Sequence, residues 1–236
     1  MSGEHERAAA PRERLDRHRI LVAAVAMIDE SGLGELSMRS LGRRLGVEAM
    51  ALYRYVPSRE SLLDGVVELV VDEMYADPLM HLLPEDDWQD YVVRLAHGVR
   101  RLALRHPQVF PLVATRPPAA PWVRPPLRSL HWIESFLAGL LSHRFTEQQA
   151  VDAYQAVSSF LLGHLLLEIS AMGVDVVAVE ENGTTGQEPD PGAAVGSYPV
   201  LLRLAPLLAA GHFADEFDAS LANLLHRIAP GAATQG

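Results

Sequence analysis

Apolar residues recur at helical spacing along almost the whole chain, and glycine or proline separates one such segment from the next. In the first segment Ile20, Ala24 and Ile28 repeat at intervals of four, and Gly32 follows where a helix C-cap is expected. The one run of β-branched residues, at 174–179, is too short to indicate a sheet. The sequence therefore predicts an all-α protein. The expected helices span about 16–31, 37–45, 47–55, 58–75, 87–106, 110–115, 124–143, 146–172, 197–211 and 213–229.

The same pattern divides the chain into two domains with short flanking segments. Residues 1–15 lack an apolar period and are expected to form a flexible arm, and residues 230–236 a tail. Three short helices within residues 16–60 form the first domain, which a helix at 59–76 links to a second helical domain at 77–229. Inside the second domain, the acidic, glycine- and proline-containing stretch 173–196 is expected to be a long loop.

Composition excludes several classes of protein. The chain has 236 residues, is 49% hydrophobic and contains no cysteine, which rules out disulfides, thiolate zinc sites and a cysteine nucleophile. Apolar runs are interrupted well before the ~18 residues that a membrane span needs. No apolar stretch that could serve as a secretory signal precedes Ile20. We therefore expect a cytoplasmic protein without a membrane partner.

Familiar catalytic motifs are also missing from the sequence. It has no H-E-x-x-H, no G-x-S-x-G, no P-loop and no repeated E-x-x-H of a di-iron bundle. We expect that the protein is not an enzyme and that it has no cofactor or metal site.

Charge is concentrated in one short part of the chain. The formal net charge is −10, yet residues 37–59 hold five arginines and one acidic residue, Glu48. The arginines are Arg39, Arg43, Arg44, Arg54 and Arg59. A small basic patch on an acidic protein suits local approach to a polyanion such as DNA.

This basic window has the spacing of a helix-turn-helix. Ser37 can cap the first of its two helices, and Gly46 can adopt the positive φ that a tight turn needs. The residues expected to be buried between helices are Leu41, Leu45, Val47, Leu52 and Val56, with Gly42 allowing a neighbouring helix to come close. If Leu52 faces the core, Met50 and Arg54 lie on the opposite side of their helix. That face could read DNA bases, or it could be an ordinary solvated surface.

Residues 18–78 resemble the DNA-binding domain of the tetracycline-repressor (TetR) family. The resemblance rests on motifs that occur in the family's order: Ser31-Gly32, Leu36-Ser37-Met38-Arg39, Leu45-Gly46-Val47, Leu52-Tyr53-Arg54-Tyr55-Val56 and Leu62-Leu63-Asp64. A fainter similarity to the effector-binding half of tetracycline repressors continues through Trp88, Thr115-Arg116-Pro117 and 158–163. It implies a helix-turn-helix domain followed by a helical domain for effector binding and dimerisation.

The resemblance also implies which residues touch a double-stranded DNA operator. These are Ser37, Arg39, Ala49, Met50, Ala51, Tyr53, Arg54, Tyr55 and Arg59. Ala49, Met50 and Ala51 stand where tetracycline repressors carry polar and proline residues, so the operator sequence is expected to differ.

Two long apolar stripes in the second half suggest a homodimer. One runs along 146–172 through Tyr154, Val157, Leu161, Leu165 and Ile169, and the other along 213–229 through Phe213, Phe217, Leu221, Leu224, Leu225 and Ile228. Each stripe could equally face the core of its own chain. The resemblance favours the dimer, formed through the helices near 146–172 and 213–229.

Aromatic and polar residues of the second half are candidates for an effector pocket. They are Trp88, Tyr91, Phe110, Thr115, Trp132, Phe136, Ser158 and His164, although aromatic residues at helical spacing are more often core. His164 and Glu168, at i and i+4, could hold a metal, anchor an effector or contact each other. By the resemblance, Tyr75 and Leu112 replace the histidines through which tetracycline repressors recognise their magnesium–drug chelate. We therefore expect a small, largely apolar organic effector and not tetracycline.

Together these features predict a ligand-responsive transcriptional regulator. We expect a repressor that binds a palindromic operator as a homodimer and that a small organic effector releases, through a shift of the helix at 59–76. The alternative is a helical small-molecule-binding protein that has lost DNA recognition.

Overall fold

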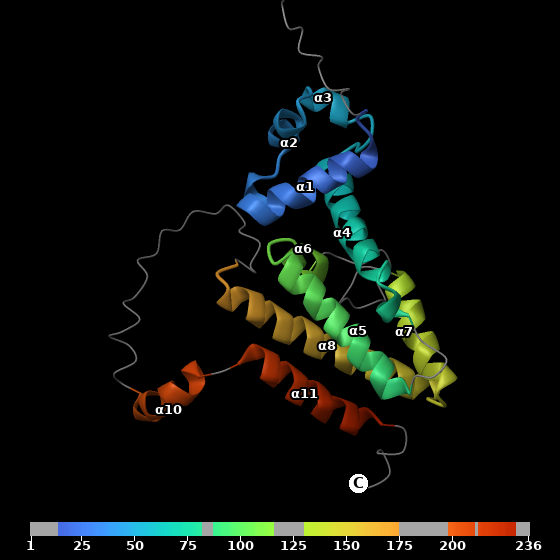
Figure 1. Ribbon diagram of the computed structural model, residues 1–236, viewed down its shortest axis with the longest axis vertical. Helices are drawn as coiled ribbons and strands as arrows, with labels where there is room; N and C mark the ends of the chain where they lie inside the picture. Colours follow the sequence, from blue (N-terminus) through green and yellow to red (C-terminus); the bar gives the residue numbers. More distant parts are fainter. Residues whose placement is uncertain (1–13, 82–86, 116–129, 175–197, 211, 230–236) are drawn as a thin grey trace, which may run out of the picture. The chain divides into compact units, whose positions relative to one another are not determined.

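A computed structural model describes residues 14–81, 87–115, 130–174, 198–210 and 212–229 (Figure 1). Within these residues every regular element is a helix, which confirms the predicted all-α fold. The chain divides into two compact units between Glu73 and Met74. The first unit contains α1 (Arg17–Ser31), the 3-10 helix η1 (Leu33–Glu35), α2 (Met38–Leu45), α3 (Ala49–Leu52) and most of α4 (Arg59–Tyr75).

Local signals set the ends of the first helices. The Asp16 side chain accepts a hydrogen bond of 2.8 Å from the amide of Arg19, which caps α1. Ser37 and Ser40 form a reciprocal capping box at the start of α2. Gly46 ends α2 with φ 70° in the left-handed region, as the turn signal predicts. These three caps fix the start of α1 and both ends of α2.

Packing in the first unit follows the predicted core. Leu41, Leu52 and Val56 are fully buried, whereas Leu45 and Val47 are only partly covered. A Cβ atom on Gly42 would lie 2.8 Å from the Val47 carbonyl oxygen. Gly42 therefore lets the turn and the start of α3 lie directly against α2.

Helix α3 is shorter than predicted. The sequence predicts a helix over 47–55, whereas the structure has one turn at Ala49–Leu52, followed by turn residues 53–55. The amide of Val56 still bonds to the carbonyl of Leu52 at 3.0 Å. Pro57 then follows, and a proline disfavours helical backbone in the residue before it.

The second unit is built around α8 (Glu147–Ala171), which packs against α5 (Trp88–Arg105), α6 (Phe110–Thr115), α7 (Leu130–Ser142) and α11 (Phe213–Ile228). The 3-10 helix η2 (Pro78–Met80) packs on α5. The sequence predicts that the α7 helix begins at residue 124, but residues 116–129 lie outside the described part of the chain. Three other predicted segments also lie outside it: the arm up to residue 13, most of the loop 173–196 and the tail.

One described helix, α8, is long and apolar enough to pass a test for a membrane span. The expectation that no apolar run approaches such a length is therefore too strict. A core helix of a soluble protein passes the same test, and α8 packs on four other helices and carries the buried Glu168. One such helix is only weak evidence for a membrane span.

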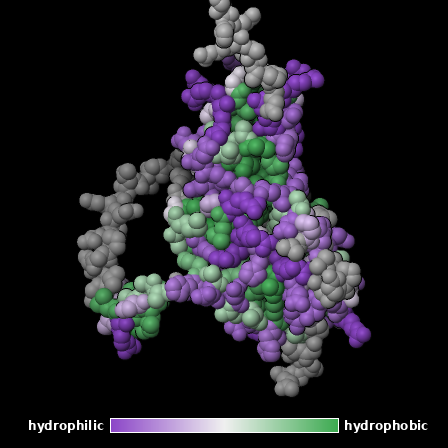
Figure 2. All heavy atoms as spheres, in the orientation of Figure 1, coloured by the Kyte–Doolittle hydropathy of each residue, from purple (hydrophilic) through white to green (hydrophobic). Residues whose placement is uncertain are grey.

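Helix α10 (Pro199–Ala209) differs from the other helices of the second unit. None of its residues is buried, and Figure 2 shows it with a largely hydrophobic surface. The large apolar residues that are exposed on it and just before it are Tyr198, Val200, Leu201, Leu202, Leu204, Leu207 and Leu208. Apolar exposure on this scale in one helix marks a surface suited to an interaction.

Candidate DNA-binding surface and ligand cavity

The short helix α3 and the turn after it expose Met50, Tyr53 and Arg54, although Tyr53 and Arg54 lie in the turn and not on the helix as predicted. Leu52 is fully buried, whereas Met50 is 76% exposed and Tyr53 41% exposed. Arg54 is exposed as well. Since a solvent-exposed methionine beside a tyrosine and an arginine gains nothing from packing, this face is suited to contact another molecule.

The basic window that contains this face has several exposed arginines. Arg39, Arg43, Arg54 and Arg59 are all exposed. Arg44, the fifth arginine of the basic window, instead forms a two-point ion pair with Glu30 of α1, with N–O distances of 2.5 and 2.7 Å. The sequence window overstates the charge of the patch because Glu30 lies outside it and neutralises one arginine.

The other predicted DNA-binding residues have identifiable positions. The Ser37 hydroxyl accepts a hydrogen bond of 3.0 Å from the amide of Ser40, so its first role is to cap α2. Tyr55 is 37% exposed in the turn after α3. Ala49 and Ala51 are partly covered. Their contacts with DNA remain predictions.

Most of the predicted effector-pocket residues lie in the core of the second unit. Phe110, Trp132 and Phe136 are each at most 1% exposed. The Trp88 ring packs edge-on against Phe145, with ring centroids 5.1 Å apart. Their burial agrees with the alternative interpretation, that aromatic residues at helical spacing form core, and a contact of any of the four with an effector stays a prediction.

The polar members of the predicted set are engaged elsewhere. Ser158 is buried beside Tyr154, and burial raises the pKa of the Tyr154 hydroxyl while its hydrogen bond to Ser158 opposes that shift. The Thr115 hydroxyl donates to the Pro111 carbonyl at 2.7 Å, within its own helix.

His164 and Glu168 do not bond to each other but each contact a neighbouring helix, and a role for either in anchoring an effector stays a prediction. The His164 Nε2 atom lies 3.1 Å from the carbonyl oxygen of Phe213 on α11. Glu168 accepts hydrogen bonds from Arg100 of α5. Each side chain thus joins α8 to a different neighbouring helix. Among the described residues, no group of three or more His, Asp or Glu side chains could hold a metal ion.

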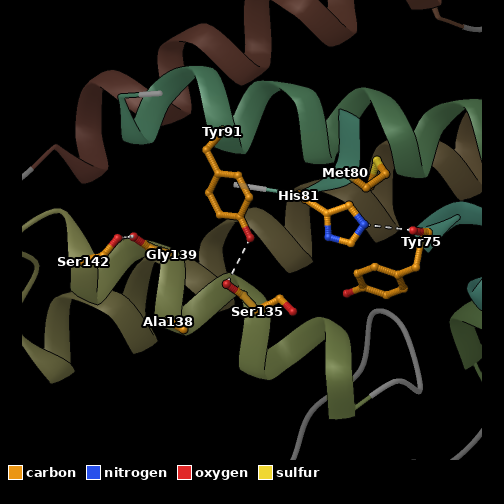
Figure 3. A pocket seen from close by; sticks show the side chains of 8 residues that line it. All are labelled: Tyr75, Met80, His81, Tyr91, Ser135, Ala138, Gly139 and Ser142. Carbon is orange, nitrogen blue, oxygen red and sulfur yellow. Dashed lines mark hydrogen bonds between the residues drawn. The ribbon is translucent and has the colours of Figure 1, made fainter. Parts of the chain in front are cut away.

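A cavity of about 300 Å³ lies elsewhere in the second unit (Figure 3). Its eight described lining residues come from the end of α4, from η2 and the residue after it, from α5 and from α7. They are Tyr75, Met80, His81, Tyr91, Ser135, Ala138, Gly139 and Ser142. Tyr91 is the one predicted pocket residue that lines this cavity.

Of the other seven lining residues, sequence analysis pointed only to Tyr75, which by the resemblance stands in place of a drug-recognising histidine, and it missed the remaining six. One signal could have indicated part of the set, because Ser135, Gly139 and Ser142 recur at i, i+4 and i+7 along one face of an otherwise apolar helix. The remaining residues come from three other segments, and only packing brings them together. Small residues on α7 leave the space that the cavity occupies.

Hydrogen bonds fix the polar groups of the cavity. The Tyr91 hydroxyl donates to the Ser135 carbonyl oxygen at 3.0 Å, and the His81 Nε2 atom lies 3.2 Å from the Tyr75 carbonyl oxygen (Figure 3). Burial raises the pKa of the Tyr75 hydroxyl, the nearby Tyr91 raises it further, and a hydrogen bond with Ser135 opposes both effects. Tyr75 is therefore an uncharged phenol at physiological pH.

The predicted dimer stripes pack inside their own chain. Tyr154, Val157, Leu161, Leu165 and Ile169 of α8 are buried, as are Phe217, Leu221, Leu224 and Leu225 of α11. Because α8 and α11 pack against each other, these apolar stripes are accounted for without a second chain. The buried stripe residues thus form core in the single chain, and a homodimer formed through the helices near 146–172 and 213–229 stays a prediction.

The first unit is thus a helix-turn-helix with an exposed, arginine-flanked face, and the second is a helical domain with a cavity; this is the architecture of a DNA-binding regulator. Comparison with known proteins agrees. Residues 20–66 match the family model described as bacterial regulatory proteins, tetR family. Residues 81–231 match the tetracyclin repressor-like C-terminal domain. The chain therefore belongs to the TetR family and is a DNA-binding transcriptional regulator.

Individual relatives support this assignment. An HTH-type transcriptional regulator of Saccharopolyspora erythraea is 29% identical over 163 residues, which cover 69% of this chain and 65% of that protein. The class A tetracycline repressor of transposon 1721 from Escherichia coli is 28% identical over 178 residues, which cover 75% of this chain and 76% of that protein. The crystal structure of a possible TetR family transcriptional regulator from Streptomyces coelicolor A3(2) superposes with a TM-score of 0.69 at 28% identity. The superposition covers 89% of this chain and 97% of that chain.

Proposed function

We propose that this protein is a ligand-responsive repressor that binds a palindromic DNA operator as a homodimer in the cytoplasm. A small, largely apolar organic effector releases it from DNA. The observation that carries the proposal is the outer face of α3, where Met50 is 76% exposed while Leu52, two residues later, is fully buried. A helical ligand-binding protein without DNA recognition would leave this face and its arginines unexplained.

Each side chain on the face suits a particular contact with DNA. The Arg54 guanidinium can donate two hydrogen bonds to the acceptors of a guanine edge. Met50 and Ala51 can contact a thymine methyl group, and the Tyr53 hydroxyl can bond to a phosphate. The other exposed arginines, such as Arg39 and Arg59, would then hold the phosphate backbone in register.

A homodimer would use the outer faces of α8 and α11. These faces carry small exposed residues, Ser159 and Gly163 on α8 and Ala219 and Ala222 on α11. Small residues let helices of two chains approach closely. The exposed apolar residues of α10, such as Leu207 and Leu208, add surface that a second chain could cover. Two copies of α3 would then read half-sites about one helical turn, ~34–36 Å, apart.

The cavity connects effector binding to the DNA-binding unit through the chain itself. Tyr75, which lines the cavity, is the last residue of α4, and α4 begins in the first unit. An effector that moves Tyr75 would shift the helix that carries the helix-turn-helix. A coupling of about 1–3 kcal/mol between the two sites is enough to change operator affinity 5- to 150-fold.

The test begins with selection of bound duplexes from a random-sequence DNA library. We expect enrichment of an inverted repeat and, in a mobility-shift assay, a steep loss of affinity as salt rises. The double variant Tyr53→Ala, Arg54→Ala should lose specific binding and keep its helicity. Arg144→Ala, which removes an equal charge from the exposed turn after α7, is the matched control. The proposal is wrong if no repeat is enriched or if both variants bind the selected duplex equally.

A further inference from the structure

We propose that Met50 is a reversible oxidation site and that its oxidation switches operator binding off. The oxidant is a small two-electron oxygen donor of the hydroperoxide class, and the product is methionine sulfoxide on the outer face of α3. This inference rests on the proposed function, because the sulfoxide acts by disturbing the contact between Met50 and a base. Such a signal reaches the DNA-binding unit without passing through the cavity.

Met50 is the most exposed methionine in the described part of the chain. It is 76% exposed, and Met172, the residue after α8, is 55% exposed. The other described methionines are at most 9% exposed, and they are Met27, Met38, Met74 and Met80. Because susceptibility to oxidation follows exposure, a peroxide in solution reaches Met50 and Met172 and leaves these four sulfurs protected.

The composition of the chain removes the usual competitor for a peroxide. Cysteine thiolates are the most readily oxidised sulfur groups of proteins, and this chain has no cysteine. An exposed thioether is therefore the sulfur that a peroxide meets first. The step needs no cofactor, since hydrogen peroxide and the thioether give the sulfoxide and one molecule of water. The O–O bond breaks, an S–O bond forms, and the sulfur supplies the two electrons.

Oxidation at this position changes the surface of the first unit and not its core. Met50 is the second residue of α3, and Leu52, two residues later, is the fully buried anchor of that helix. The sulfoxide oxygen of an exposed side chain is hydrated, so it costs the folded state little. A sulfoxide at the 2% exposed Met80 would instead place a polar oxygen in the core.

The same oxygen is unfavourable once Met50 meets DNA. A thymine methyl group offers an apolar contact and no hydrogen-bond donor, so the sulfoxide oxygen would lose its water without gaining a partner. We expect the operator affinity to fall at least about tenfold. Leucine could make the same apolar contact, whereas only the thioether can be oxidised and then restored, because reductases return methionine sulfoxide to methionine.

The experiment treats the full chain with hydrogen peroxide, with and without the selected duplex. Peptide mass spectrometry measures the sulfoxide at each methionine, and a mobility shift measures operator affinity. We expect Met50 and Met172 to be oxidised before the four buried methionines, and affinity to fall as the Met50 sulfoxide rises, with helicity unchanged. The duplex should slow oxidation of Met50 and not of Met172. Full affinity after complete oxidation of Met50 would overturn the proposal, as would oxidation of Met50 no faster than that of the buried methionines.

Matched variants assign the effect to one sulfur. The readout is the ratio of operator affinities before and after peroxide, so any change that a substitution makes by itself cancels. We expect a ratio below about twofold for Met50→Leu and a wild-type ratio of at least about tenfold for Met172→Leu. Met50→Gln, which carries a polar group of similar length, should bind more weakly than Met50→Leu without any peroxide. Equal ratios for Met50→Leu and wild type would overturn the assignment.

Reversal separates a switch from damage. Reductases for both sulfoxide epimers, supplied with dithiothreitol, should restore the mobility shift of the oxidised protein, and a loss that they do not restore would overturn the reversible site. The untreated protein separates this inference from the proposed function. If it binds no duplex, the proposed function is wrong. If it binds and still binds once Met50 is oxidised, only the oxidation switch is wrong.

Discussion

The Arg100 guanidinium and the Glu168 carboxylate form a two-point ion pair that ties α5 to α8. The Nε atom of Arg100 lies 3.0 Å from Oε2 of Glu168, and the two side chains are only 19% and 7% exposed. The guanidinium also lies over the Phe217 ring of α11, 5.5 Å from its centroid. One arginine thus connects three helices of the second unit.

Breaking this pair from one side should destabilise the protein strongly. In Glu168→Ala the Arg100 charge would stay largely buried without its partner, so we expect a loss of about 3 kcal/mol in the free energy of unfolding. Urea denaturation, monitored by far-ultraviolet circular dichroism, measures this free energy of unfolding. The double variant Arg100→Leu, Glu168→Leu should recover much of the loss, because it leaves no buried charge. If the free energy of unfolding of Glu168→Ala lay within about 1 kcal/mol of the wild-type value, the pair would not have this structural role.

Gly42 and Gly34 provide a matched test of close packing in the first unit. A Cβ on Gly42 would lie 2.8 Å from the Val47 carbonyl oxygen, whereas one on Gly34 would meet nothing within 4 Å. We expect Gly42→Ala to destabilise the first unit by about 1–3 kcal/mol and Gly34→Ala to change it by less than about 0.5 kcal/mol. Thermal unfolding of both variants measures these changes. Equal melting temperatures for Gly42→Ala and Gly34→Ala would show that the turn at Val47 can move aside.

Met50 should affect DNA recognition without affecting the fold. Because its side chain is 76% exposed, Met50→Ala should leave the free energy of unfolding within about 0.5 kcal/mol of wild type. The same change should alter which base is preferred at one position of each half-site, by about 1–3 kcal/mol. Repeating the duplex selection with the variant measures the preference. An unchanged selected sequence would remove Met50 from the reading face.

Gly163 tests the proposed dimer. It is exposed on α8, and a Cβ there would meet nothing within 4 Å in the single chain. If α8 of a second copy packs closely on it, Gly163→Leu should shift sedimentation equilibrium towards the monomer. Ala171→Leu, at the exposed end of the same helix, is the control. Identical equilibria for both variants and wild type would place the interface elsewhere.

The Glu30–Arg44 pair gives the first unit a pH dependence with a defined sign. The hydrogen bond from Arg44 lowers the pKa of Glu30 below its usual 4.5, with burial opposing and the charge of Arg44 assisting. A lowered pKa stabilises the folded state above about pH 4.5, and the stabilisation is lost as the pH falls through the folded-state pKa. The difference in melting temperature between wild type and Glu30→Gln should therefore narrow below pH 4.5. Glu35→Gln, which removes another exposed carboxylate, is the control. A melting-temperature difference between wild type and Glu30→Gln that persists to pH 2 would contradict the pairing of Glu30 with Arg44.

Several features of the fold follow from the sequence alone. The Ser37 cap, the Gly46 turn and the outward position of Met50 opposite Leu52 depend on residues within one or two helical turns of each other. Such signals are local, so propensity and periodicity reveal them. The length of α3 is the exception, because the residues after it form a turn before Pro57 although their apolar pattern continues.

The cavity and the charged contacts depended on tertiary structure. Trp132 and Phe136 were candidates for the pocket although their spacing favoured core, and packing buries both of them. Glu168 pairs with a residue 68 positions away, and not with His164 one turn away. Sequence spacing reports which residues share a helix face, but it does not report which other helix covers that face. Burial, pairing and cavity formation depend on that second helix, and so only the folded chain decides them.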